Sequence, residues 1–227
     1  MNSDKTHSSL PRYAALFWDN DGVLVDTERW YFQATREVLA GVGIDLTLEL
    51  YFEHFLVSSG GTSTLAFARG LSQADVAALQ ASRNERYLQM LEQECITLAG
   101  VREALERLRP HFVMGIVTSS LRQHFEAIHR RTGLLEFFDF TITHEDYPRS
   151  KPAPDPYLAA IAHTGLPSNK CLAIEDAPRG LLAAQAAALD CWVIPTEFTR
   201  RAPFTGATRI LNHITDVSTL LLGANSA

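Results

Sequence analysis

A short apolar run, residues 13–18, stops abruptly at the polar sequence Asp19-Asn20-Asp21-Gly22. This pattern is typical of a buried strand that ends in a polar loop. Four further apolar runs share this form and helical patterns separate them; the runs are 112–117, 140–143, 171–174 and 191–194, and the helical patterns are 100–109, 121–132, 155–164 and 179–188. Strands that alternate with helices predict a Rossmann-like α/β fold, in which helices cover both faces of a doubly wound parallel sheet.

The alternation of strands and helices is interrupted between Trp30 and Glu94, where helical patterns alone occur. The last of them begins with Ser72 three residues before Asp75, which is a helix-capping signal. The four patterns cover residues 31–39, 46–56, 62–68 and 72–91. The sequence therefore predicts an all-α helical-bundle cap that is inserted after the first strand and its loop.

This interruption sets the expected domain bounds. We expect an α/β core formed by residues 13–29 and 95–227, a helical cap formed by residues 30–94, and hinges near 28–30 and 94–100. Residues 1–12 are polar, and they predict a loose N-terminal tail.

Composition excludes several classes of function. The 227 residues carry 20 basic and 26 acidic side chains, a formal charge of −6, whereas proteins that bind duplex nucleic acid normally show a basic face. The longest apolar stretch, 181–189, falls well short of the roughly 20 residues that a bilayer requires. The three cysteines, Cys95, Cys171 and Cys191, form no C-x-x-C pair. We expect a cytoplasmic protein, a monomer by default, that binds neither nucleic acid nor a membrane.

Side chains suited to catalysis follow the predicted strands. Ligands gather at the carboxyl ends of the strands in such sheets. Asp19 and Asp21 follow the first strand, and a proline-rich segment later holds Lys151. The remaining candidates, at the ends of two other strands, are Thr118, Ser119, Glu175 and Asp176. Paired carboxylates can attack an electrophile and move a proton, and a purely oxygen ligand set points to Mg²⁺.

Each of these motifs also has an ordinary structural interpretation. Asp-Asn-Asp-Gly is a favoured turn sequence, and Thr118 or Ser119 could cap the following helix. Lys151 could be a surface lysine, and the pair Glu175-Asp176 could serve the N-terminus of a helix. Their shared position at one edge of the predicted sheet favours the functional interpretation.

Taken in order, the four motifs resemble those of the haloacid dehalogenase superfamily, most closely its β-phosphoglucomutase-like and phosphoglycolate phosphatase-like hydrolases. The matching segments are Asp19-x-Asp21-Gly22-Val23-Leu24-Val25-Asp26-Thr27-Glu28, Thr118-Ser119-Ser120, Lys151-Pro152-x-Pro154-Asp155-Pro156-Tyr157 and Glu175-Asp176-x-x-x-Gly180. The resemblance implies an α/β core with a helical cap inserted after the first motif, and this agrees with the interruption of the strand pattern.

The resemblance also implies roles for these residues. Asp19 is expected to be the nucleophile that forms an aspartyl-phosphate, and Asp21 to protonate the leaving oxygen and then activate water. The Asp19 side chain, the Asp21 carbonyl and Asp176 are expected to hold Mg²⁺, with Glu175 as a ligand or as a partner of the ligands.

Phosphate binding is implied for a second group of residues. The resemblance assigns the phosphoryl oxygens to Thr118 and Ser119, and it assigns neutralisation of the charge shared by Asp19 and the phosphoryl group to Lys151. Positioning and charge stabilisation supply most of the barrier reduction in such reactions.

The distribution of lysine separates members of this superfamily. Lys5, Lys151 and Lys170 are the lysines of the chain, so the lysine that phosphonatases carry in the cap is missing. The β-phosphoglucomutases carry a histidine where this chain has Tyr31, and also a cap lysine and a loop arginine; here the loop 57–63 reads Val-Ser-Ser-Gly-Gly-Thr-Ser. Haloacid dehalogenases lack the second aspartate.

These differences favour a phosphatase that acts on a small phosphorylated metabolite, either a sugar phosphate or a phosphoglycolate-like compound. A β-phosphoglucomutase-like mutase is the alternative. A non-catalytic phosphoacceptor or binding domain is a third interpretation, and the complete set of Asp19, Asp21, Lys151 and Asp176 argues against it.

The cap offers further candidates for binding. Gly60, Gly61 and Thr62 open a predicted helix, and their backbone N–H groups could bind a substrate oxygen; an ordinary loop between helices is the alternative. Three cap-side arginines, Arg29, Arg36 and Arg69, are either anion contacts or solvated side chains. The aromatic residues 30–32 are expected to pack the cap, and the eight histidines to be structural or surface groups.

Overall fold

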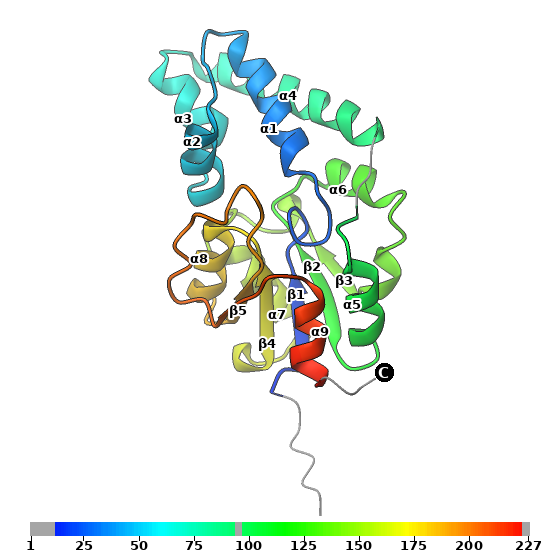
Figure 1. Cartoon of the computed structure of the whole chain (residues 1–227). Helices are drawn as coiled ribbons and strands as arrows, with labels where there is room; N and C mark the ends of the chain where they lie inside the picture. Colours follow the sequence, from blue (N-terminus) through cyan, green and yellow to red (C-terminus); the bar gives the residue numbers. More distant parts are fainter. Residues whose placement is uncertain (1–11, 94–96, 224–227) are drawn as a thin grey trace, which may run out of the picture.

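The computed structural model describes residues 12–93 and 97–223, which form a six-stranded sheet and the helices around it (Figure 1). The strand order is β3-β2-β1-β4-β5-β6, and neighbouring strands pair in parallel. The strands are β1 (Ala15–Trp18), β2 (Val113–Val117), β3 (Phe140–Ile142), β4 (Cys171–Glu175), β5 (Asp190–Val193) and β6 (Arg209–Ile210). The prediction of a doubly wound parallel α/β sheet is confirmed.

Alternate residues of β1 face opposite sides of the sheet, as the twofold period of a strand requires. Leu16 and Trp18 belong to one buried cluster, and Ala15 and Phe17 to the other. The helices α5 (Val101–Leu108), α6 (Arg122–His129) and α9 (Thr215–Leu222) supply the first cluster, and α7 (Asp155–Thr164) and α8 (Pro178–Ala186) supply the second. The central strand is therefore buried on both faces, which explains its continuous apolar run.

The cap lies above the carboxyl ends of the strands and is helical, as predicted (Figure 1). It comprises α1 (Glu28–Ala40), α2 (Leu48–Tyr51), α3 (Gly61–Ala68) and α4 (Gln73–Gln93). Ser72 and Asp75 cap α4 reciprocally: the Asp75 carboxylate accepts the Ser72 N–H at 3.0 Å, and the Ser72 hydroxyl accepts the Asp75 N–H at 3.3 Å. The second predicted helix differs, because α2 continues as a π-helix over Phe52–Val57.

Aromatic rings fill the interior of the cap, in agreement with the sequence. Tyr31 makes edge contacts with Phe55 and Tyr87, and Phe32 makes one with Tyr51. Trp30, by contrast, packs against the cluster on the sheet.

Parts of the expected N-terminal tail and of the cysteine set lie outside the described residues. Residues 1–11 of the expected tail and Cys95 are not described; Cys171 and Cys191 are buried free thiols. Within 12–93 and 97–223, no helix has the length and apolar character needed to cross a bilayer.

Candidate active site

The loop after β1 lies directly against the end of β4. The Asp19 N–H donates to the Ile174 carbonyl at 2.9 Å, so the backbone pairing with β4 continues past Trp18. Gly22 follows with a φ of +85°, and a β-carbon there would lie 2.5 Å from an Asp176 carboxylate oxygen. Only glycine allows this turn and this close approach together. The first and fourth motifs therefore meet at one edge of the sheet.

Lys151 joins three strand ends. Its Nζ donates to Asp19 Oδ1 and Glu175 Oε1 at 2.7 Å each, and to the Val117 carbonyl at 2.8 Å. The side chain is only 2% exposed, so the alternative of a surface lysine is wrong. Burial opposes the positive charge, but Asp19 and Glu175 outweigh this effect and raise the Lys151 pKa. Lys151 is therefore a fixed cation beside the candidate nucleophile.

Three carboxylates could hold a cation here. Asp19, Glu175 and Asp176 each offer an oxygen within 4.8 Å of the others. The Asp19 pKa is raised to about 7: burial raises it most, Lys151 lowers it, and Glu175 and Asp21 raise it further. Burial, followed by repulsion from Asp19 and Glu175, raises the Asp176 pKa well above its usual value. A buried cluster of hard oxygen donors that repel one another fits Mg²⁺.

The carboxylates of this cluster differ in the hydrogen bonds that they accept. Glu175 Oε1 accepts hydrogen bonds from Lys151 and from the Tyr157 hydroxyl. The carboxylate of Asp176 is buried, and it accepts no hydrogen bond within the described part of the chain. Asp176 thus keeps its oxygens for a ligand, whereas Glu175 fixes Lys151.

Asp21 is held by several donors. Thr27 donates to its Oδ1, and Oδ2 accepts from Ser120 at 2.7 Å, from Thr118 at 3.3 Å and from the Asn20 amide at 3.3 Å. Ser120 comes from the loop after β2, and Thr27 directly precedes α1, the first helix of the cap. Asp21 therefore contacts both sides of the connection between core and cap.

The structure places the two predicted phosphate-binding residues, Thr118 and Ser119, in different surroundings. Thr118 is fully buried, and its hydroxyl bonds Asp21 and the Ser120 N–H. The Ser119 Oγ is buried without a partner among the described residues and lies at the cavity described below. An unpartnered hydroxyl there suits a phosphoryl oxygen. Neither residue caps α6: its N-cap is Leu121, and Glu145 accepts the N–H of Arg122 at 3.0 Å.

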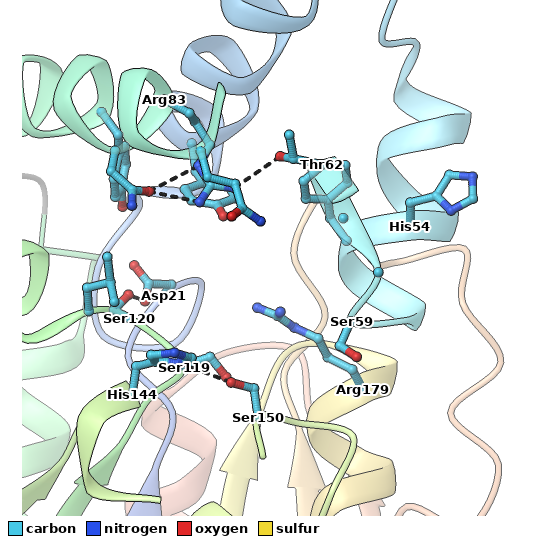
Figure 2. A pocket seen from close by; sticks show the side chains of 18 of the residues that line it. Asp21, His54, Ser59, Thr62, Arg83, Ser119, Ser120, His144, Ser150 and Arg179 are labelled. Carbon is cyan, nitrogen blue, oxygen red and sulfur yellow. Dashed lines mark hydrogen bonds between the residues drawn. The ribbon is translucent and has the colours of Figure 1, made fainter. Parts of the chain in front are cut away.

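A cavity of about 370 Å³ lies between the sheet edge and the cap, within the range of about 300–1,000 Å³ that is usual for small-molecule sites. Asp19, Asp21 and Ser119 line its core side, and Gly60, Gly61 and Thr62 line its cap side. The Thr62 hydroxyl accepts a hydrogen bond from Arg83 at 3.1 Å. The structure therefore brings the predicted cap loop to face the carboxylates (Figure 2).

Sequence reasoning missed both arginines of this cavity. Arg83 on α4 and Arg179 on α8 line it, whereas Arg29, Arg36 and Arg69 do not. A helical stripe carried a signal for the first, because Gln80, Arg83 and Tyr87 recur at spacings of three and four residues and all line the cavity. Arg179 had no comparable signal.

Two further side chains connect the cap to the core. Glu28, at the start of α1, accepts a hydrogen bond from the Tyr51 hydroxyl; burial is the main cause of its raised pKa. His124 of α6 donates through Nε2 to the Asn84 carbonyl of the cap at 3.2 Å. Both line the cavity, so His124 is a cavity residue as well as a structural one.

Comparison with known proteins identifies relatives of similar length. CbbY of Rhodobacter capsulatus is 32% identical over 204 residues, which is 85% of this chain and 90% of that protein. The fructose-1-phosphate phosphatase YqaB of Escherichia coli is 32% identical over 186 residues, 79% of this chain and 95% of that protein.

A solved structure and a family match agree with these relatives. CbbY of Rhodobacter sphaeroides, in complex with xylulose-(1,5)bisphosphate, is 26% identical with a TM-score of 0.77, over 90% of this chain and 96% of that one. Residues 16–194 match the haloacid dehalogenase-like hydrolase family, and these residues contain all four motifs. The chain therefore belongs to the haloacid dehalogenase-like hydrolase family.

Proposed function

We propose that this chain is a Mg²⁺-dependent phosphatase that hydrolyses a small phosphorylated metabolite, a sugar phosphate or a phosphoglycolate-like compound, through an aspartyl-phosphate at Asp19. The observation that carries the proposal is the contact of Lys151 with Asp19 at 2.7 Å beside Asp176, whose carboxylate accepts no hydrogen bond from the described residues. A fixed cation, a carboxylate and an acidic cluster together suit phosphoryl transfer. The names of the relatives, fructose-1-phosphate phosphatase and hexitol phosphatase B, support the substrate class.

In the first half of the reaction, an Asp19 carboxylate oxygen attacks the phosphorus atom, and the bond from phosphorus to the substrate oxygen breaks. Asp21 gives its proton to that oxygen, so the metabolite leaves as an alcohol. Lys151 offsets the charge shared by Asp19 and the phosphoryl group, and Ser119 donates to a phosphoryl oxygen.

In the second half, Asp21 is a carboxylate and removes a proton from water. The resulting hydroxide attacks the phosphorus atom of the aspartyl-phosphate, the bond to Asp19 breaks, and phosphate is released. Asp19 returns as a carboxylate and Asp21 regains its proton. Closure of the cap over the cavity excludes other water during the transfer.

The metal site in this proposal consists of the Asp19 and Asp176 carboxylates and the Asp21 carbonyl, with Glu175 positioning Lys151. When bound, Mg²⁺ supplies positive charge to the phosphoryl oxygens. The oxygen donors of this cluster suit that ion, and they do not suit zinc or copper.

The organisation of the molecule forms part of the proposal. The cap is taken as residues 30–94 and the core as 13–29 with 95–227, and Gly60, Gly61 and Thr62 are taken to bind substrate oxygens. A monomeric state and a cytoplasmic location also stay predictions.

Phosphate release by the purified protein tests the function. The substrates are p-nitrophenyl phosphate, fructose 1-phosphate, a hexitol phosphate and 2-phosphoglycolate, each with Mg²⁺ and with a chelator. We expect Mg²⁺-dependent release that Asp19→Asn abolishes and that Asp45→Asn, an exposed control, preserves. Undiminished hydrolysis by Asp19→Asn would refute the role of the nucleophile. Isomerisation of glucose 1-phosphate, followed in parallel, would indicate the mutase instead.

A further inference from the structure

Arg179 reaches from the first turn of α8 into the cavity, and in the view of Figure 2 its guanidinium lies between Asp21 of the core and Ser59 of the cap loop. Burial lowers the pKa of Arg179, but the negative charges of Glu28 and Asp19 outweigh this effect and raise it above its ordinary value. Within residues 12–93 and 97–223, the guanidinium makes neither a hydrogen bond nor an ion pair inside 4.0 Å. It is therefore a cation with unused donors aimed into a cavity.

Arg83, the other arginine of the cavity, is arranged differently. Its Nη1 donates to Thr62, its Nε and Nη2 donate to the Asn84 side chain at 3.2 and 2.8 Å, and its guanidinium stacks 4.9 Å from the ring centre of Tyr31. The protein thus already positions Arg83 and occupies much of its donor capacity. Arg179 alone of the two presents an unoccupied donor fork.

The charged side chains around the cavity form two groups. In the first group, Lys151 and a divalent ion would offset the carboxylates around Asp19. Of the other charged side chains that line the cavity, Arg83 and Arg179 are cations, and Glu28, which accepts a hydrogen bond from Tyr51, is a carboxylate. The neighbouring cap segment 58–63 contains serine, threonine and glycine and no charged residue. Once the carboxylates around Asp19 are offset, the two arginines therefore exceed the one remaining lining carboxylate in charge.

An uncharged polyol would leave the donors of Arg179 without a charged partner. A second phosphate would accept from the guanidinium in a paired arrangement, which is the strongest hydrogen-bond geometry that arginine offers. Because Arg179 belongs to α8 of the core, its guanidinium supplies the positive charge of this subsite, and the cap loop does not need a cation of its own.

We propose that Arg179 is a specificity-determining residue that binds a second phosphate, so the preferred substrates are sugars or polyols phosphorylated at both ends. The inference rests on the proposed phosphatase function. The CbbY complex holds a doubly phosphorylated sugar; the inference for this chain adds the residue that selects such a substrate.

The test compares two substrates that offer the same phosphoryl group, fructose 1,6-bisphosphate and fructose 1-phosphate, by kcat/KM for release of the 1-phosphate. We expect the wild type to prefer the bisphosphate. Arg179→Gln should lower kcat/KM for the bisphosphate about 10- to 100-fold, chiefly through KM, and for the monophosphate less than about 3-fold, because only the first loses a charged hydrogen-bond partner. Arg179→Lys should retain part of the preference.

Three controls isolate the role of the side chain. Arg36→Gln removes an exposed cap arginine outside the cavity and should leave both substrates unchanged. The double variant Glu28→Gln/Arg179→Gln removes the positive and the negative charge together, and it should lose the preference as Arg179→Gln does. Circular dichroism melting confirms that each variant is folded.

Calorimetric binding of both sugars to Asp19→Asn separates this inference from the proposed function. If the wild type released phosphate from no substrate, the proposed phosphatase function would be contradicted. The subsite would still be tested by the preference of Asp19→Asn for binding the bisphosphate and by the loss of that preference in Asp19→Asn/Arg179→Gln. Equal losses for the two sugars on removal of Arg179, or a wild type that does not prefer the bisphosphate, would overturn the inference.

Discussion

At the scale of single residues, Lys151 shows how the site is assembled from strands that are distant in sequence. Its ammonium group has three N–H bonds, and Asp19, Glu175 and the Val117 carbonyl accept them. Such a buried cation needs all of its acceptors, because a missing partner leaves a buried charge uncompensated. Asp19, the proposed nucleophile, is therefore oriented by the same contacts that hold the ends of β1, β2 and β4 together.

In the proposed mechanism, Asp21 is an acid in the first half of the reaction and a base in the second. We predict that Asp21→Asn still accepts a phosphoryl group at Asp19 from an activated ester, but that its turnover falls about 10²- to 10⁴-fold because proton transfer is lost. Thr27 donates to Oδ1 of Asp21 and Ser120 to Oδ2, so the single amide oxygen of asparagine can keep one of these hydrogen bonds, and the other hydroxyl can rotate to accept from the amide NH2. Intact-protein mass spectrometry after rapid quenching should reveal the phosphorylated chain, and an unchanged steady-state rate would contradict the role.

His129 positions Asn20, the residue between the two aspartates. Its Nε2 donates to the Asn20 amide oxygen at 2.8 Å, and Asn20 in turn donates to Asp21. Burial is the main cause that lowers the His129 pKa from 6.5 to about 4, so this imidazole stays neutral in the fold.

This shift predicts a loss of stability in acid. Between pH 6.5 and 4, His129 is protonated in the unfolded chain but stays neutral in the folded protein. The free energy of unfolding therefore decreases as the pH is lowered, by about 2 kcal/mol from pH 8 to pH 5. His129→Gln should remove that part of the pH dependence, as measured by urea unfolding at both values. The exposed control His111→Gln should behave as the wild type. An unchanged slope in His129→Gln would show that His129 is not the cause.

At the scale of elements, the junction between β4 and α8 depends on one small residue. Gly180 lies beneath the Glu175 carboxylate, and a β-carbon there would overlap it. The helix thereby approaches the end of the strand closely enough for Glu175 to reach both Lys151 and Tyr157.

Gly180→Ala should therefore displace Glu175 and disturb the cation that it holds. We predict a loss of about 1–3 kcal/mol in the free energy of unfolding from overpacking, together with a fall in kcat, since Lys151 loses an acceptor. Gly41→Ala is a matched control, because a β-carbon there only approaches the Val38 carbonyl, at 3.3 Å. A Gly180→Ala protein with normal kcat would show that Glu175 does not position Lys151.

The elements also show where sequence reasoning succeeds. Buried parallel strands leave long apolar runs, and the residues that follow them converge because the strands end at one edge. By contrast, β6 is only two residues long and both are exposed, so it has no apolar signature. Arg179 lies one residue after the helix-starting Pro178, at the third unspecified position of the fourth motif. Its orientation toward the cavity depends on how the cap sits above α8, which local patterns do not encode.

At the scale of the whole molecule, the core and the cap are linked at the cavity itself. Asp21 accepts from Thr27, which directly precedes the first helix of the cap, and His124 of the core donates to the Asn84 carbonyl of the cap. Binding at the carboxylate cluster is therefore expected to affect the unfolding of the entire chain.

Metal binding tests this expectation. Mg²⁺ that binds the folded chain alone stabilises it by about 2.7 kcal/mol at a concentration 100 times its Kd. For a chain of 227 residues this corresponds to a rise in Tm of roughly 5–10 °C. Differential scanning calorimetry with Mg²⁺ and then with excess chelator should show the rise and its reversal.

Asp176→Asn should remove this rise in Tm, because it replaces the buried carboxylate that has no hydrogen-bond partner in the described structure. Without metal the same variant should melt at or above the wild-type temperature, since one negative charge leaves a cluster in which burial and repulsion raise the pKa of both Asp19 and Asp176. Asp45→Asn, which alters an exposed carboxylate, should keep the full rise. Equal stabilisation of the Asp176 variant by Mg²⁺ would place the metal elsewhere in the protein.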